Sequence, residues 1–242
     1  TEGPIRFAPV GWADRVFVAS DDGWLYALRA ADGKLLWKHR GGPTDQKLLG
    51  NERMVSRWPA RGGPVVFEDT VYFAAGIWPS DGIFLHAIDA RSGDVKWTNN
   101  GTGGLLIPQP HGGAESRSGV SPQGYLLASD TQLFVPTGRA VPAALGRADG
   151  QLAYYHLQKN GQTGGSWAML ADRYLLNGGC LFEQSTGELA TKRGFGPMVA
   201  TPEKKTDTSR SCGIRRTTNR SRLTIPILMG VWMMWPWKAL LK

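Results

Sequence analysis

Two segments of this chain repeat one pattern of residue types. In each, an alternating apolar run leads into a glycine turn, and a tryptophan follows four residues after the glycine. The pattern occupies residues 25–37, with Gly33 and Trp37, and residues 85–97, with Gly93 and Trp97. Weaker copies end at Tyr154 and at residue 191, where the aromatic residue is lost. A repeated β unit therefore builds the chain.

A second marker has the same spacing. An aspartate precedes a short apolar strand ahead of each copy, at Asp14, Asp69, Asp130 and Asp172. The four units lie near residues 13–37, 68–97, 129–154 and 171–191. A unit of about 40 residues is typical of a β-propeller blade, which contains about four short strands. Blades bury their faces only against neighbouring blades, so we expect the units to stack.

The turn and the tryptophan have distinct physical roles in this pattern. Glycine at positions 33 and 93 tolerates the positive φ that a tight turn between antiparallel strands requires. Trp37 and Trp97 then lie at a fixed distance past the turn, where each can cover about 150–250 Å² between adjacent sheets. We therefore predict that these four residues, with Asp89, dock one blade on the next.

The second copy resembles the tryptophan docking motif of the pyrroloquinoline-quinone-like (quinoprotein-type) β-propeller repeat family. Its matching residues are Ala87, Asp89, Ser92, Gly93 and Trp97. The first copy matches less fully, because an arginine stands in the aspartate position. The resemblance implies an all-β propeller. It does not fix function, since the repeat occurs in quinone-dependent dehydrogenases, in the scaffold lipoprotein of the outer-membrane β-barrel assembly machinery and in secreted bacterial proteins.

Composition agrees with an all-β repeat protein. The chain has 32 Gly and 15 Pro in 242 residues, and turn clusters recur along it. Four units are fewer than a closed propeller of this family contains. We therefore expect an incomplete arc of blades over residues 1–202, belonging to a fragment of a longer protein, with an irregular C-terminal tail.

Residues 203–242 depart from the repeat. They begin with a basic Ser/Thr-rich stretch and continue into an apolar run that contains two prolines. The basic stretch could contact nucleic acid or an anionic membrane, or the whole tail could be an out-of-frame or non-native segment. We expect no nucleic-acid partner. We also expect no stable membrane span, because the uncharged run falls short of about 20 residues.

The sequence offers no catalytic residue and no metal site. Its two cysteines, Cys180 and Cys212, are not adjacent, and its four histidines lack ligand spacing. The family's quinone-dependent dehydrogenases hold pyrroloquinoline quinone with an adjacent cysteine pair and a calcium ion. We therefore expect no cofactor. Under the alternative that the chain is part of such a dehydrogenase, we expect pyrroloquinoline quinone with calcium.

The insertions between units carry the binding candidates. A long connection, residues 46–63, contains Arg57, Trp58 and Arg61, and two further loops contain Trp78 and Arg139. Arginine beside tryptophan suits the recognition of planar anions or rings. We predict that these five residues converge on one propeller face. The alternative is that the arginines are solvated or ion-paired and that the tryptophans pack under the loops.

Two functions follow from the sequence. We favour a non-catalytic binding or scaffold module that presents its loops to a protein, glycan or small-molecule ligand. The alternative is a fragment of a quinone-dependent oxidoreductase. The resemblance alone implies a periplasmic, cell-envelope or secreted location.

Overall fold

The computed structural model describes residues 1–50, 52–109, 112–138, 141–157 and 164–191, together with the backbone of three short strands further on. The chain divides into two compact units, Thr1–Gly194 and Phe195–Lys242. In the second unit, the backbone forms a three-stranded antiparallel sheet from β21 (Ala200–Pro202), β22 (Cys212–Ile214) and β23 (Leu223–Ile225). The remainder of the tail discussed above lies outside the described residues.

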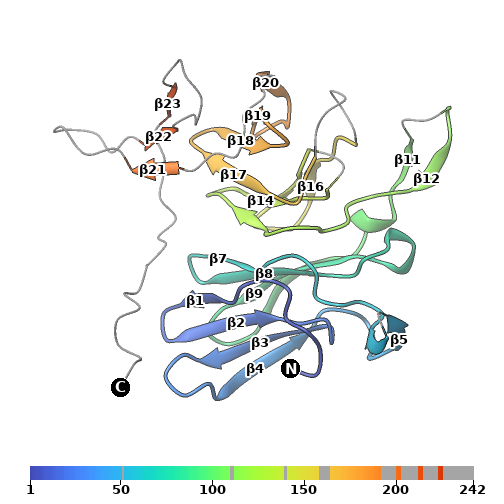
Figure 1. The fold of residues 1–242 in the computed structure, drawn as a ribbon, viewed down its shortest axis with the longest axis vertical. Helices are drawn as coiled ribbons and strands as arrows, with labels where there is room; N and C mark the ends of the chain where they lie inside the picture. Colours follow the sequence, from blue (N-terminus) through green and yellow to red (C-terminus); the bar gives the residue numbers. More distant parts are fainter. Residues whose placement is uncertain are drawn as a thin grey trace. The chain divides into compact units, whose positions relative to one another are not determined.

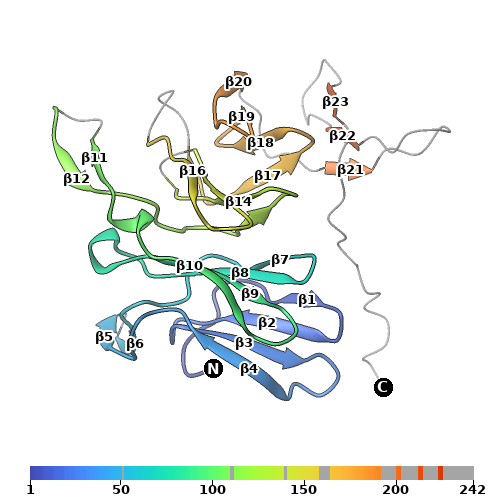
Figure 2. The same cartoon turned by 180° about the vertical axis from the view of Figure 1, so that it is seen from behind.

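In its described part, the first unit contains four antiparallel four-stranded sheets, each made from consecutive strands. Figures 1 and 2 show these sheets stacked face to face in chain order. The first sheet comprises β1 (Val10–Trp12), β2 (Arg15–Ala19), β3 (Trp24–Arg29) and β4 (Leu35–Arg40). The second comprises β7 (Val65–Phe67), β8 (Thr70–Ala75), β9 (Phe84–Asp89) and β10 (Val95–Asn99).

The third sheet comprises β13 (Leu127–Ala128), β14 (Gln132–Val135), β15 (Ala143–Gly146) and β16 (Leu152–Tyr154). The fourth comprises β17 (Ala168–Ala171), β18 (Tyr174–Asn177), β19 (Cys180–Glu183) and β20 (Leu189–Thr191). The first strands of successive sheets contact one another. This is the arrangement of propeller blades, so the expected all-β arc of repeated blades is confirmed.

In the described residues, two hairpins and one short 3₁₀ helix lie in the connections between the sheets, and a second 3₁₀ helix lies in the loop between β8 and β9 of the second sheet. The hairpins are β5 (Lys47–Gly50) with β6 (Arg53–Ser56), and β11 (Leu106–Pro108) with β12 (Glu115–Arg117). The helices are η1 (Pro79–Asp81) and η2 (Thr102–Gly104). Figures 1 and 2 both show the two hairpins projecting on the same side of the stacked sheets.

The glycine turn has the same geometry in every blade. The N–H of Gly33 donates to the carbonyl of Arg29 at 2.8 Å, and Gly93 donates to Asp89 at 2.9 Å. The equivalent bonds of Gly150 and Gly187 are both 2.8 Å. All four glycines have positive φ, the conformation that only glycine adopts without strain. After each turn, the third and fourth strands shift register within a few residues of the pattern's aromatic position.

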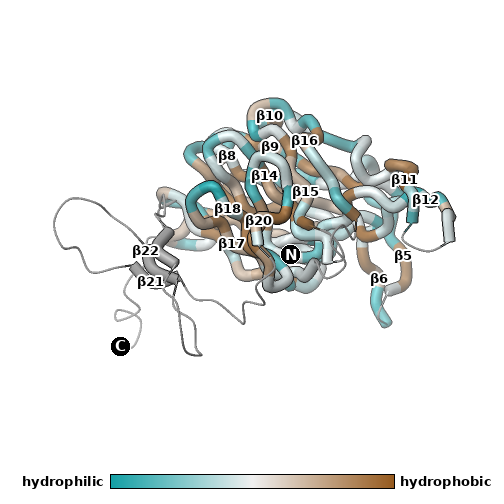
Figure 3. The backbone as a smooth tube through the Cα atoms, turned by 90° about the horizontal axis from the view of Figure 1, so that it is seen from above, coloured by the Kyte–Doolittle hydropathy of each residue, from teal (hydrophilic) through white to brown (hydrophobic). Residues whose placement is uncertain are grey.

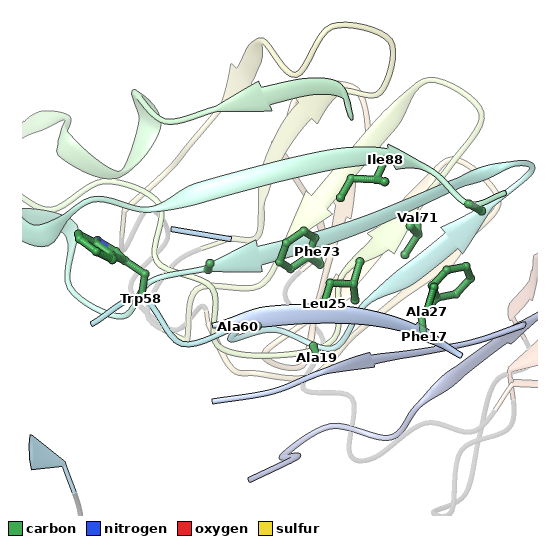
Figure 4. Packing of buried hydrophobic residues seen from close by; sticks show 11 residues of the cluster. Phe17, Ala19, Leu25, Ala27, Trp58, Ala60, Val71, Phe73 and Ile88 are labelled. Carbon is green, nitrogen blue, oxygen red and sulfur yellow. The ribbon is translucent and has the colours of Figure 1, made fainter. Parts of the chain in front are cut away.

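Hydrophobic residues fill the spaces between adjacent sheets. Figure 4 shows the cluster between the first two sheets, where Phe17, Leu25, Phe73 and Ile88 are completely buried and Trp58 closes one end. Similar clusters lie between the second and third sheets and between the third and fourth. Burial of each large side chain contributes about 2–3 kcal/mol, so each blade depends on its neighbours for a core.

The alternating strand directions give the stacked sheets two opposite edges. We call the edge formed by residues 20–23, 41–50, 52–64, 76–83, 100–109, 112–126, 136–138, 155–157, 164–167 and 178–179 the loop edge. It carries the turns between second and third strands and the connections between sheets. The opposite turn edge comprises residues 13–14, 30–34, 68–69, 90–94, 129–131, 147–151, 172–173 and 184–188.

Candidate binding surface

On the turn edge, an aromatic ring of each blade lies against the turn glycine of the next blade. A Cβ added to Gly93 would come within 2.9 Å of the Trp37 ring, and one added to Gly150 would come within 2.6 Å of the Trp97 ring. Tyr154 lies against Gly187 in the same way, at 2.5 Å. Glycine is therefore required at these turns for close approach as well as for φ.

The hydrogen bonds of these rings differ between blades. The Trp97 indole N–H donates to the Arg147 carbonyl at 2.9 Å, and the Tyr154 hydroxyl donates to the Gln184 carbonyl at 2.9 Å. The buried Trp37 indole nitrogen has no such partner among the described residues. The carbonyl equivalent to those of Arg147 and Gln184 is that of Ala90. It accepts a hydrogen bond from the Arg15 guanidinium instead, at 3.3 Å.

Of the other two residues predicted to dock blades, Asp89 is the last residue of β9 and Gly33 lies in a turn. One carboxylate oxygen of Asp89 accepts the backbone N–H groups of Arg91 and Ser92, at 2.9 and 2.8 Å. These backbone hydrogen bonds lower the pKa of Asp89, and the one from Ser92 has the largest effect. Asp89 therefore stabilises its own turn. Gly33 has positive φ, but no atom lies within 4 Å of an added Cβ, so no ring docks on it among the described residues.

On the loop edge, Arg57 and Trp58 are joined to the loop that carries Trp78. The Arg57 guanidinium forms an ion pair with Asp81 at 3.0 Å and donates to the Gln46 side chain at 3.3 Å. The Trp58 indole N–H donates to the Asp81 carbonyl at 2.7 Å, and the Trp58 side chain is buried. Asp81 thus links Arg57 and Trp58 to η1. This partner was not predicted from the sequence.

The remaining predicted binding residues have different surroundings. Arg61 lies 3.6 Å from the buried carboxylate of Asp21. Trp78 is 63 % exposed. Arg139 lies outside the described residues. The loop edge therefore carries four of the predicted residues, Arg57, Trp58, Arg61 and Trp78. Both arginines have acidic partners. Of the two tryptophans, only Trp78 is mostly exposed to solvent. Their binding role stays a prediction.

Exposed apolar side chains are concentrated on the loop edge. Ten large hydrophobic residues are exposed in the described part of the chain, and only Leu35 and Val95 belong to the fourth strands beside the turn edge. The others lie on the loop edge or in the N-terminal segment against it: Ile5, Leu48, Leu49, Met54, Trp78, Leu106, Tyr125 and Trp167. Leu49 is 75 % exposed and Leu106 is 61 % exposed. Figure 3 shows hydrophobic colouring on β5 and at β11.

The turn edge has a polar groove between the second and third blades. Its volume is about 410 Å³, and its lining includes Asp69, Lys96, Trp97, Asp130 and Arg147. Lys96 pairs with Asp69 at 3.0 Å, and Arg147 pairs with Glu68 at 2.7 Å. The hydrogen bond and charge of Lys96 lower the pKa of Asp69. Both cations in the groove are therefore already neutralised.

Two histidines that are distant in sequence meet between the first two blades. The rings of His39 and His86 lie 4.9 Å apart, and His86 stacks on Phe73. The His86 ring is 4 % exposed; its Nε2 donates to the Gly41 carbonyl at 2.8 Å, which leaves Nδ1 to accept from the Thr98 hydroxyl at 2.9 Å. Burial lowers the pKa of His86 to about 4. Both ring nitrogens are occupied, so His86 is a structural residue.

The described residues do not fit a quinone cofactor with its calcium ion. They contain no group of three His, Cys, Asp or Glu side chains that could hold a metal ion. The sequence as a whole has no adjacent cysteine pair. We therefore derive no reaction step from such a group.

The repeated sheets and the ring–glycine contacts between them define a β-propeller repeat protein. A family model described as "Outer membrane protein assembly factor BamB" matches residues 1–182. Because this match spans most of the chain, the chain belongs to that family, and the resemblance to the pyrroloquinoline-quinone-like repeat is confirmed. No curated protein sequence matches the chain.

Three solved structures share the fold at low identity. BamB from Moraxella catarrhalis has a TM-score of 0.51 and 15 % identity over 89 % of this chain and 62 % of its own. The quinohemoprotein alcohol dehydrogenase ADHIIG from Pseudomonas putida HK5 has a TM-score of 0.54 and 16 % identity over 78 % of this chain and 34 % of its own. A europium-containing methanol dehydrogenase has a TM-score of 0.54 and 14 % identity over 79 % and 42 %.

The chain spans less than two thirds of the length of each of these three structures. The solved structures that share this fold include both an assembly factor and enzymes, so the fold by itself does not choose between them. In the described part of the chain, no helix is long and apolar enough to cross a membrane.

Proposed function

We propose that this chain is a non-catalytic propeller module that binds a protein partner through its loop edge. The observation that carries the proposal is the uneven distribution of exposed apolar side chains. Large exposed apolar patches on a soluble protein mark interaction surfaces. Leu49, Met54 and Leu106 lie on hairpins that project from the sheets, and hydrophobic residues there contribute nothing to the cores between blades.

The loop edge is also rigidly supported. The Trp58 indole and the Arg57 guanidinium both hold Asp81, and the Gly76 N–H donates to the Pro59 carbonyl at 3.0 Å. These contacts fix the connection between the first two blades to the loop that carries Trp78. A preorganised surface loses less conformational entropy on binding, so the arrangement suits recognition of a partner.

The proposed location is supported by the description of the family. We propose that the module acts in the bacterial cell envelope, because the family is described as an outer membrane assembly factor.

We also propose that the repeat domain ends by residue 202 and that residues 203–242 are a non-native or out-of-frame tail. Sequencing the gene across codon 202 tests this boundary: a restored frame that encodes further glycine-turn patterns supports it, and confirmation of the basic tail contradicts it.

The binding surface is tested by charge substitution at matched positions. Leu49→Asp and Leu106→Asp place a charge on the loop edge, whereas Leu35→Asp and Val95→Asp place it on exposed positions of the fourth strands. We expect the first pair to abolish co-purification of the protein's envelope partner and the second pair to leave it unchanged. Equal loss with both pairs, at unchanged thermal stability, would contradict the proposal.

A further inference from the structure

Three segments of the chain meet at Asp21, in the turn between β2 and β3. The Asp21 N–H donates to the Pro4 carbonyl at 2.9 Å, and the Ser56 N–H donates to the Asp21 carbonyl at 3.1 Å. The Asp21 side chain is 2 % exposed. The N-terminal segment, the turn after β2 and the end of β6 are therefore joined at one residue, whose carboxylate is buried.

Two arginines from different segments contact this carboxylate. The Nε of Arg6 donates to Oδ2 of Asp21 at 2.5 Å, and the Nε of Arg61 lies 3.6 Å from Oδ1. The second distance is an ion-pair distance but is too long for a hydrogen bond. Oδ1 of Asp21 and Nε of Arg61 are both buried without a hydrogen-bond partner in the described part of the chain. The cluster is thus incompletely satisfied, which is costly for buried charged groups.

The outer ends of both guanidiniums remain available. The Arg6 side chain is 40 % exposed and the Arg61 side chain 34 % exposed, and each contacts Asp21 through Nε. No described residue accepts a hydrogen bond from their Nη groups. Because Nε is anchored, each planar group is held in place and can present its Nη donors to a carboxylate in bidentate geometry.

Acidic neighbours do not occupy these donors. Asp22, the adjacent residue, accepts hydrogen bonds from the Tyr26 hydroxyl at 2.7 Å and from the backbone N–H groups of Glu2 and Trp24. Glu2 itself pairs with Lys47 at 3.0 Å. Two guanidiniums therefore share the single carboxylate of Asp21, and their Nη donors have no hydrogen-bond acceptor among the described residues.

An aromatic pair lies next to the segments that carry the two arginines. Phe7 and Tyr125 pack edge to face with ring centroids 5.2 Å apart, and Tyr125 is 47 % exposed. The Tyr125 hydroxyl accepts the Ala8 N–H at 3.0 Å, and its backbone bridges to Gly63. Phe7 is thus the neighbour of Arg6 in the chain, and Tyr125 bridges to Gly63, two residues after Arg61. This favours a ligand whose carboxylate stands beside an apolar group.

We propose that Arg6 and Arg61, positioned by the buried Asp21, bind a carboxylate of the polypeptide partner next to one of its apolar side chains. The polypeptide source of the carboxylate rests on the proposed function, whereas the site itself does not. Binding supplies the acceptor that the two guanidiniums lack, and charge-assisted bidentate hydrogen bonds are among the strongest in proteins.

The test uses the side-chain Nε–Hε resonances of Arg6 and Arg61 in ¹⁵N-labelled protein, titrated with the amidated dipeptide N-acetyl-Glu-Leu. We expect both resonances to shift in one saturable transition. The N-acetyl-Gln-Leu amide, which lacks the carboxylate, should leave both unmoved. Inorganic phosphate distinguishes a general oxyanion site: tighter binding of phosphate than of the Glu dipeptide would overturn the carboxylate assignment.

Matched variants separate the site from the fold. Arg61→Gln should weaken dipeptide binding by about tenfold or more, while Arg29→Gln, which removes an exposed Arg29–Asp32 pair on the turn edge, should not change it. Asp21→Asn should weaken binding with both arginines present. If it unfolds the protein, Arg6→Gln replaces it. Unchanged dipeptide affinity in Arg61→Gln and Arg6→Gln overturns the proposal.

The failure of each proposal is distinguishable. Dipeptide binding at Arg6 and Arg61, together with partner binding that survives Leu49→Asp and Leu106→Asp, would support the carboxylate site and contradict the proposed loop-edge partner. Partner binding that is lost in those variants, with no response of either arginine to the Glu dipeptide, would contradict the carboxylate site alone.

Discussion

The ring of Trp97 lies so close to Gly150 of the next blade that an added Cβ would come within 2.6 Å of a ring carbon. The same relationship joins Trp37 to Gly93 and Tyr154 to Gly187. A glycine at each turn is therefore half of a contact between blades. The chain stacks because ring and glycine recur at one spacing.

Alanine substitutions at two of these glycines separate backbone strain from ring contact. Gly33 and Gly150 have nearly the same φ, +71° and +69°, but only Gly150 faces a ring. Gly33→Ala should cost about 1 kcal/mol of unfolding free energy, the strain of a left-handed alanine. Gly150→Ala should cost about 2 kcal/mol more, because the Trp97 ring must move. Urea denaturation measures both, and equal costs would contradict the docking contact.

Phenylalanine substitutions test the unequal hydrogen bonds of the two tryptophans. Trp97→Phe removes the N–H that donates to Arg147 and should destabilise the fold by about 1 kcal/mol beyond the effect of the smaller ring. Trp37→Phe removes a buried N–H without a described partner and should cost clearly less. Thermal unfolding of both variants measures the difference. A larger loss for Trp37→Phe would show that its indole nitrogen is satisfied in solution.

Acid should destabilise the interface between the first two blades through His86. Its pKa is about 4 in the folded chain and about 6.5 when unfolded. The unfolded chain therefore binds more protons between these values, so stability is fully present above about pH 6.5 and decreases as pH falls toward 4. The loss is on the order of 3 kcal/mol. Burial and Arg40 also lower the pKa of His39, which adds in the same direction.

Urea titrations from pH 4 to pH 7.5 measure this dependence. His86→Gln cannot be protonated and keeps a polar side chain near the Gly41 carbonyl, so most of the pH slope should disappear in this variant. His156→Gln is the matched control, because the half-buried His156 ring also contacts a backbone carbonyl, that of Thr186, but lies outside the first two blades. An unchanged slope in His86→Gln would assign the acid sensitivity to other groups.

Much of the fold could be predicted from the sequence because its signal is local. Gly33, Gly93 and the aromatic residue four positions later identify each turn and strand pair without reference to distant residues. The segment 46–63 was predicted only as a long connection. Its Lys47–Ser56 part forms a hairpin, which the apolar alternation around Leu48 and Val55 could have suggested.

The candidate site was less predictable because its contacts join distant segments. Arg57 and Trp58 were selected by residue type, but their shared partner Asp81 lies more than twenty residues away. His39 and His86 have no ligand spacing in sequence, and they meet only because blades stack. The same holds for Arg6 and Arg61, which become neighbours through Asp21.

Site-specific photo-crosslinking in living cells tests the central claim, that the loop edge binds a protein partner. A photoreactive phenylalanine analogue replaces Trp78, Met54 or Leu106 on the loop edge, and Leu35 or Val95 near the turn edge. We predict that the three loop-edge positions crosslink to one envelope protein, identified by mass spectrometry, and that the other two do not. Crosslinks to that protein only from positions 35 and 95 would contradict the account.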